Sequence, residues 1–100
     1  MEHDLIELST PGEVLKEEFL DPMGITPYAL AKSIFVDPPR IAAILKGKRK
    51  ITADTAMRFS KFFGNSAEFW MNMQSRYELE VLSEDKDSNI KKITRFHKAS

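Results

Sequence analysis

The sequence predicts an all-α domain built of five short helices. Apolar residues recur three and four positions apart along most of its 100 residues, which is the spacing of an amphipathic helix. Each periodic segment also begins at a Thr, Ser, Asn or Asp, and a glycine follows most of them. The sequence shows neither an alternating strand pattern nor an internal repeat. A chain of this length is expected to form one domain with one modest core.

The first helix is predicted to run from Thr10 to about Leu20. The sequence TPGE supplies a threonine at the N-cap, a proline at the first helical position and a glutamate that completes a capping box. The sequence DPMG, residues 21–24, is expected to end this helix. The residues predicted to face inward are Val14, Leu15 and Phe19.

Thr26 and Pro27 repeat this start for the second helix, and Asp37 is the predicted N-cap of the third. Two prolines follow Asp37, and a residue that precedes proline avoids the helical region. Two alternatives stay open: Pro38 takes the first helical position, or it lies at the cap and Pro39 takes that position. The glycine of the sequence LKGK is expected to end the third helix. The residues predicted to be buried are Leu30, Ala31, Ile34, Ile41, Ile44 and Leu45.

Thr52 is the predicted N-cap of the fourth helix, which Gly64 ends, and either Asn65 or Ser66 caps the fifth. The fourth helix contributes to the predicted core through Ala56, Phe59, Phe62 and Phe63. The fifth helix carries large apolar side chains on more than one side, which exceeds what a small bundle can readily bury. We therefore predict a dimer interface on this helix in preference to core alone. The predicted interface residues are Phe69, Trp70, Met73 and Tyr77.

Charge is distributed unevenly along a chain whose formal net charge is zero. Residues 1–21 carry seven acidic side chains against Lys16 alone, whereas residues 38–50 carry five basic side chains and no acidic one. Residues 90–98 add four further basic side chains. Such a distribution can make one face of the molecule positive, which favours a polyanionic partner.

The predicted second and third helices are joined by only about three residues, FVD. So short a connection suits the steep crossing of a helix-turn-helix. The third helix then presents one face to solvent, and basic residues follow its end. This arrangement favours double-stranded DNA as the partner, with the helix in the major groove and the flanking cations on phosphates. The outward residues are Pro39, Arg40, Ala42, Ala43 and Lys46, followed by Lys48, Arg49 and Lys50.

The stretch from Thr10 to Glu80 resembles the HigA (VapI-type) antitoxins, a branch of the Xre, lambda-repressor-like helix-turn-helix family. The most specific similarity lies in PPRIAAILKGKRKITADTAMRF (38–59) and FFGNSAEFWMNMQSRYELE (62–80). The resemblance implies a five-helix lambda-repressor-like fold, a homodimer and repression of the protein's own operon through operator DNA. It also implies neutralisation of a RelE-like ribonuclease toxin.

The resemblance further implies which residues contact DNA. The base-contacting positions are Pro38, Pro39, Arg40, Ala42 and Ala43, and the phosphate-contacting positions are Thr26, Pro27, Lys46, Lys48 and Arg49. Charge and position add Lys50 to the second group. Arg40 is the best candidate to bind guanine, since alanine can only touch a thymine methyl group.

Phe35 departs from the family pattern. It stands where the turn between the second and third helices usually has a glycine. A positive φ is unfavourable for a bulky residue, so we expect either a different turn or a strained one.

The chain is predicted to divide into an acidic N-terminal segment (1–9), the helix-turn-helix domain (10–83) and a linker with a basic amphipathic tail (84–100). The tail sequence IKKITRFHK places apolar residues three apart, with basic residues between them. It either forms an amphipathic helix that docks on a partner or becomes ordered only when bound. The apolar residues of the tail are Ile90, Ile93 and Phe96.

The sequence argues against an enzyme. It has no cysteine, and His3 and His97 lie at opposite ends. It contains no carboxylate pair, metal-ligand spacing or phosphate-binding glycine loop, so we expect no catalytic residue, metal or cofactor. No apolar run approaches the ~20 residues that span a membrane, and we expect a cytoplasmic protein without a membrane partner. An orphan helix-turn-helix regulator without a toxin is the alternative function.

Overall fold

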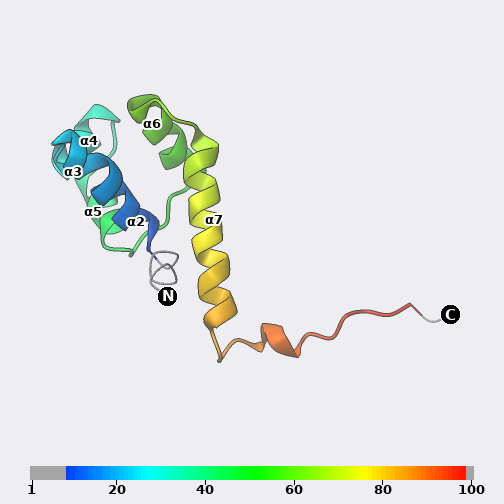
Figure 1. Ribbon diagram of the computed structural model, residues 1–100. Coiled ribbons are helices and arrows are strands. Elements are labelled where there is room, and N and C mark those ends of the chain that lie inside the picture. The colour runs from blue at the N-terminus through cyan, green and yellow to red at the C-terminus, as the bar shows by residue number, and fades with distance from the viewer. Residues whose placement is uncertain (1–8, 99–100) are drawn as a thin grey trace.

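The computed structural model describes residues 9–98, which form five helices and no strand (Figure 1). The predicted all-α helix-turn-helix fold is confirmed. The first helix consists of α2 (Pro11–Val14), a π-helical segment (Leu15–Leu20) and α3 (Asp21–Met23), and it is followed by α4 (Pro27–Ser33), α5 (Pro38–Leu45), α6 (Ala53–Phe63) and α7 (Ala67–Glu84). Most of the acidic N-terminal segment, with His3, lies outside the described residues.

The first helix extends three residues beyond its predicted end at Leu20. It continues through Pro22 to Met23 and ends at Gly24, whose φ is 67°. Proline inside an α-helix normally clashes with the carbonyl group four residues earlier. Here the preceding turn is π-helical: the N–H of Asp21 donates to the carbonyl of Lys16, five residues back. The wider turn accommodates Pro22, so DPMG ends the helix as predicted, but at Gly24 rather than directly after Leu20.

Side-chain caps begin three of the helices as predicted. Thr10 and Glu13 form a reciprocal capping box, with both hydrogen bonds at 3.0 Å. Thr26 caps α4, and Ser66 rather than Asn65 caps α7 by accepting the N–H of Phe69 at 3.0 Å. These bonds satisfy N–H groups that have no partner within the helix.

The other two helix starts lack a side-chain cap. Asp37 occupies the N-cap position of α5 with Pro38 at the first helical position, which decides between the two alternatives for the prolines. Thr52 occupies the N-cap position of α6, but its side chain makes no capping bond. Its hydroxyl lies 3.5 Å from that of Thr55.

One core unites the helices, and Trp70 and Phe59 are its largest members. Close approach of the first helix to α5 requires Gly12, because a Cβ there would overlap the carbonyl oxygen of Ile44. Phe62 was predicted to be core but is exposed, since it lies on the outer side of α6. The buried apolar residues are Leu15, Leu20, Leu30, Ala31, Ile34, Ile41, Ile44, Ile51, Ala56, Phe59 and Trp70.

The turn between α4 and α5 places Phe35 in the left-handed region. Its φ is 63°, and its side chain is 86% exposed. The N–H of Phe35 donates to Lys32 and that of Val36 to Ala31, the bond pattern with which helices usually end at glycine. The turn therefore keeps the geometry of a glycine turn and is strained, the second of the two predicted alternatives.

Phe35→Gly is expected to raise the free energy of unfolding by about 1 kcal/mol, since the left-handed region costs a bulky residue more than glycine loses in chain entropy. Thermal unfolding followed by circular dichroism would show a midpoint about 4 °C higher. Ser33→Gly is the control, because Ser33 is an exposed residue of α4 and glycine there destabilises. A midpoint lowered as much by Phe35→Gly as by Ser33→Gly would contradict the assignment of strain.

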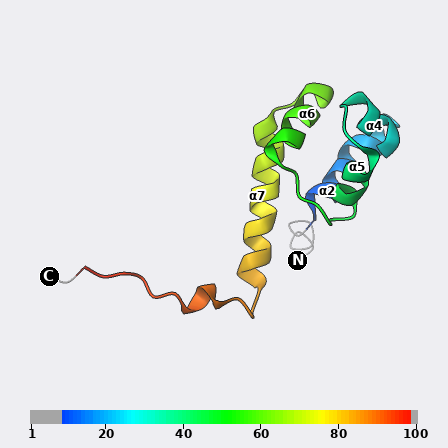
Figure 2. The same ribbon diagram turned by 180° about the vertical axis from the view of Figure 1, so that it is seen from behind.

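Helix α7 reaches beyond the other helices, and the chain then turns away from it (Figures 1 and 2). A 3-10 turn (Asn89–Lys92) follows, and residues 93–98 form no helix. The amphipathic helix considered for the tail is thus absent from residues 93–98, and the three apolar side chains of the tail are exposed. Even α7, the longest described helix, lacks the apolar length needed to cross a bilayer.

Candidate nucleic-acid interface

The predicted DNA contacts begin at the exposed N-terminus of α4. The hydroxyl oxygen of Thr26 accepts the N–H of Ala29 at 3.0 Å, and Pro27 is the first residue of the helix. Because this bond uses Thr26 as an acceptor, its O–H remains available as a donor to a phosphate oxygen. Both residues are exposed.

Helix α5 buries one face and presents another. Ile41 and Ile44 are buried in the core, whereas Pro39, Ala43 and Lys46 recur at spacings of four and three residues on a separate stripe. This stripe is exposed or half-buried, and its side chains are short until Lys46. A shallow helix surface of this kind lets the backbone approach a groove closely, as major-groove helices do.

The basic segment after α5 is anchored at both ends. Gly47 ends the helix with a φ of 75°, and the N–H of Lys48 donates to the carbonyl of Ala43 at 2.9 Å. Three residues further on, Ile51 is buried, and its N–H donates to the side-chain oxygen of Gln74 on α7 at 2.9 Å. We call residues 46–50 the basic segment. Its four cations are exposed on a backbone that the fold holds in place.

Arg40 lies at the flank of α5 rather than on its open stripe. Its guanidinium donates to the carboxylate of Asp54 at 2.8 Å and to the hydroxyl of Thr55 at 3.3 Å, both on α6. Its side chain is only 25% exposed. The residue predicted to contact guanine is thus already paired with an acid of the same chain.

Asp54 accepts from a second arginine as well. Arg58, one helical turn later on α6, donates through Nε at 2.9 Å. The hydrogen bond from Arg58, followed by that from Arg40, holds the pKa of Asp54 below its usual value. Asp54 is therefore ionised at neutral pH and carries the charge that pairs with Arg40.

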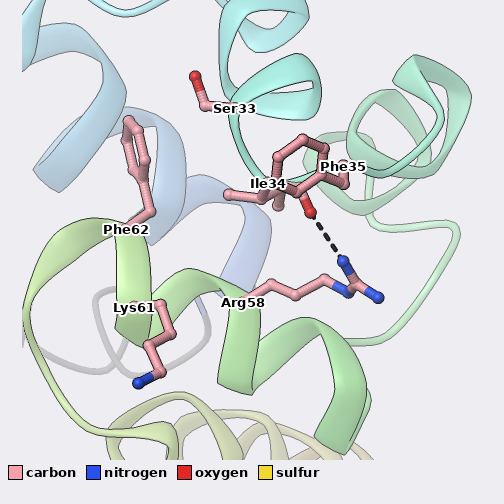
Figure 3. A pocket seen from close by; sticks show the side chains of 6 residues that line it. All are labelled: Ser33, Ile34, Phe35, Arg58, Lys61 and Phe62. Atoms are coloured by element: carbon pink, nitrogen blue, oxygen red, sulfur yellow. Dashed lines mark hydrogen bonds between the residues drawn. The ribbon is translucent and has the colours of Figure 1, made fainter.

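A hollow of about 410 Å³ lies between the α4–α5 turn and α6 (Figure 3). It is lined by Ser33, Ile34, Phe35, Arg58, Lys61 and Phe62. None of the residues predicted to contact DNA is among them. The hollow is thus separate from the surface formed by the start of α4, the α5 stripe and the basic segment.

The predicted dimer residues do not share one environment. Trp70 is fully buried within the chain, with its ring centroid 4.9 Å from those of Phe19 and Phe59 and its Nε1 donating to Asn65 at 3.0 Å. It is a core residue and offers no surface to a partner, which corrects its assignment to the interface. Phe69 is exposed, and Met73 and Tyr77 are half-buried.

Sequence reasoning missed the side chains that hold the interface in place. Gln74 stands among the apolar residues of its helix, and its spacing in the sequence does not mark it as a buried hydrogen-bond partner. Asp54 and Arg58 stand four apart on a predicted helix, which is the spacing of an ion pair and could have been recognised. Their contacts with α4 and α5 depend on the tertiary fold and are not readable from that spacing.

Comparison with known proteins gives consistent matches. The helix-turn-helix family model HTH_3 matches residues 15–70. Virulence-associated protein I of Dichelobacter nodosus is 50% identical over 78 residues, which span 78% of this chain and 72% of that protein. The structure of Pseudomonas aeruginosa antitoxin HigA with the higBA promoter has 43% identity and a TM-score of 0.72, covering 74% of this chain and 80% of that one. A P. aeruginosa protein in complex with its 18-base-pair operator DNA has 37% identity and a TM-score of 0.77, covering 88% and 96%.

Proposed function

The chain belongs to the helix-turn-helix family HTH_3, and from this membership we propose that it is a type II antitoxin that binds operator DNA as a homodimer and represses its own operon. Its similarity to HigA and to virulence-associated protein I confirms the resemblance inferred from the sequence. The family is one of DNA-binding regulators and not a class of enzymes. We place the protein in the cytoplasm, where its operator would be.

The exposed stripe of α5 beside the anchored basic segment is the observation that carries this proposal. The stripe offers small side chains to the base edges, and the basic segment offers four cations to the phosphates on either side. Phosphate contacts supply affinity and orientation, while contacts to base edges supply sequence preference. Both of the solved structures compared above contain promoter or operator DNA, which supports the same use of the surface here.

Fluorescence-anisotropy titration of a duplex from the protein's own promoter, against a scrambled duplex at near-physiological salt, tests the proposal. We expect a preference of about a thousandfold or more for the promoter duplex, as for specific regulators. Equal and weak binding to both duplexes would contradict operator recognition. Neutralisation of a partner protein would then be the first function to test.

Arg49→Ala is expected to weaken binding to promoter and scrambled duplexes by about the same factor. Arg49 is exposed in the basic segment, and a phosphate contact carries no sequence information. The slope of log K against log salt should fall in magnitude by about one unit, which anisotropy titrations at several salt concentrations would measure. Lys61→Ala removes one exposed cation from the hollow outside the proposed surface and serves as the control. An equal change of slope in both variants would contradict the placement of Arg49 on DNA.

We also propose that the protein neutralises a RelE-like ribonuclease toxin, as its similarity to HigA implies. A gene for a small basic protein beside its own, whose product co-purifies with this chain and loses ribonuclease activity on mixing, would support the pairing. An isolated gene would favour the second candidate, an orphan transcriptional regulator that uses the same DNA-binding surface.

The second half of α7 supports the homodimer. The side chains of Leu79 and Leu82 are 65% and 47% exposed, and with Ile90 they line a hollow of about 360 Å³. This half of α7 and the turn after it are acidic, whereas the tail is basic and carries exposed apolar residues. A second copy of the chain offers both the apolar surface and the opposite charge that such a patch requires. We therefore place the main dimer contact here, adjoining the predicted residues Phe69, Met73 and Tyr77.

A further inference from the structure

Asp54 connects two arginines that belong to different parts of the helix-turn-helix. One carboxylate oxygen accepts from Nη1 of Arg40 at 2.8 Å and from Nε of Arg58 at 2.9 Å. Arg40 lies in the first turn of α5, and both other residues lie on α6. A single acid on α6 therefore fixes the guanidinium nearest the open stripe of α5.

Arg58 makes a second hydrogen bond that does not involve Asp54. Its Nη1 donates to the carbonyl of Ile34 at 2.8 Å, at the end of α4 (Figure 3). This bond satisfies a helix-terminal carbonyl and links α6 to the turn that precedes α5. Loss of the charge on Asp54 would thus leave α4 and α6 joined, and it would mainly affect Arg40.

Arg40 also differs from its basic neighbours in the sequence. The four cations of the basic segment form no ion pair with any residue in the range 9–98, whereas Arg40 is paired with Asp54 and partly enclosed. An exposed ion pair is worth about as much as one phosphate contact and less than a bidentate contact with guanine. Arg40 would therefore gain little by exchanging Asp54 for a phosphate, and it would gain more by exchanging it for a suitably placed base.

We infer that Asp54 is a positioning residue that weakens DNA binding, because it holds the charge of Arg40 in an ion pair that must be broken before Arg40 contacts DNA. The inference rests on the proposed DNA-binding function. It assigns Asp54 no contact with DNA. Its effect is to lower the affinity for random DNA and for the operator by about the same factor, because the ion pair must be broken before Arg40 contacts either a phosphate or a base.

Asp54→Asn tests this inference, because the amide keeps the shape of the side chain and one hydrogen-bond acceptor but loses the charge. We expect three- to tenfold tighter binding to the scrambled duplex, and a salt slope steeper by about one unit. Binding to the promoter duplex should tighten by a similar factor, so the preference for the promoter duplex should be nearly unchanged. A structural role alone would not steepen the slope, so the slope separates the two explanations.

Asp21→Asn is the matched control. Asp21 is an equally exposed aspartate in a 2.9 Å ion pair with Lys16, on the first helix and outside the proposed surface. Asp21→Asn changes the net charge of the chain by the same amount as Asp54→Asn. Thermal unfolding of both variants would show that they are folded under the conditions of the titration. In an Arg40→Gln background, Asp54→Asn should produce no further gain in affinity, since the cation that it releases is absent.

Three results would overturn the inference. An equal change in the salt slope of Asp54→Asn and Asp21→Asn would show that the change of net charge alone accounts for the effect. Weaker binding of Asp54→Asn to both duplexes at an unchanged slope would reduce it to a structural role. An undiminished gain in the Arg40→Gln background would exclude Arg40 as the released cation. In each case the wild-type protein still prefers the promoter duplex, whereas loss of that preference in the wild type would contradict the proposed function itself.

Discussion

Trp70→Ala is expected to lower the free energy of unfolding by about 3–5 kcal/mol, the usual cost of removing a large aromatic side chain from a core. Trp70 is fully buried and lies among the rings of Phe19, Phe59 and Phe63, with centroid distances of 4.9, 4.9 and 5.8 Å. Removing it also leaves the side-chain oxygen of Asn65 without its donor. The whole free energy of unfolding of a domain of this size is only about 5–15 kcal/mol.

Thermal unfolding of Trp70→Ala should show a midpoint lower by at least about 15 °C. Phe69→Ala is the control, because Phe69 is the neighbouring aromatic residue on the same helix and is 42% exposed. It should cost less than about 2 kcal/mol. Equal losses of stability in the two variants would contradict the assignment of Trp70 to the core and of Phe69 to the surface of α7. A Trp70→Ala variant that unfolds at the wild-type midpoint but no longer dimerises would do the same, because it would return Trp70 to an interface role.

The helices were predictable because their signals are local. The capping box at Thr10 and the cap at Thr26 each depend on residues within three positions of one another, and the structure has both. The end of the first helix was not predictable in the same way. Pro22 normally stops a helix, and only the π-helical turn before it allows the chain to continue to Met23.

The exposure of the surface that we propose for DNA was easier to predict than the side-chain contacts within it. The exposed stripe of α5 follows from the burial of Ile41 and Ile44, which the helical period gives directly. The pairing of Arg40 with Asp54 crosses fourteen positions of sequence and depends on how α6 packs on α5. Periodicity along one helix carries no information about such a contact, so the sequence predicts Arg40 only as an outward residue of α5.

The second large effect is expected from the double variant Leu79→Glu, Leu82→Glu, which should convert the proposed dimer to a monomer. The two side chains are mostly exposed in the protomer, so their replacement costs little within one chain. In the dimer that we propose, four added carboxylates would meet across an apolar contact that already lies among acidic residues. Sedimentation equilibrium should give the mass of one chain, 11.5 kDa.

Loss of the dimer should weaken binding to the promoter duplex by about a hundredfold or more. Two linked DNA-contacting helices bind two half-sites with an effective concentration that a monomer lacks, and the gain from such linkage is commonly 10²–10⁴-fold. Binding to the scrambled duplex should change far less. Because added negative charge alone also weakens binding to DNA, Met23→Glu, Met57→Glu is the control, with two exposed methionines outside α7. A dimeric mass for the α7 variant would move the interface toward Phe69, Met73 and Tyr77, and equal losses in both variants would reduce the effect to charge.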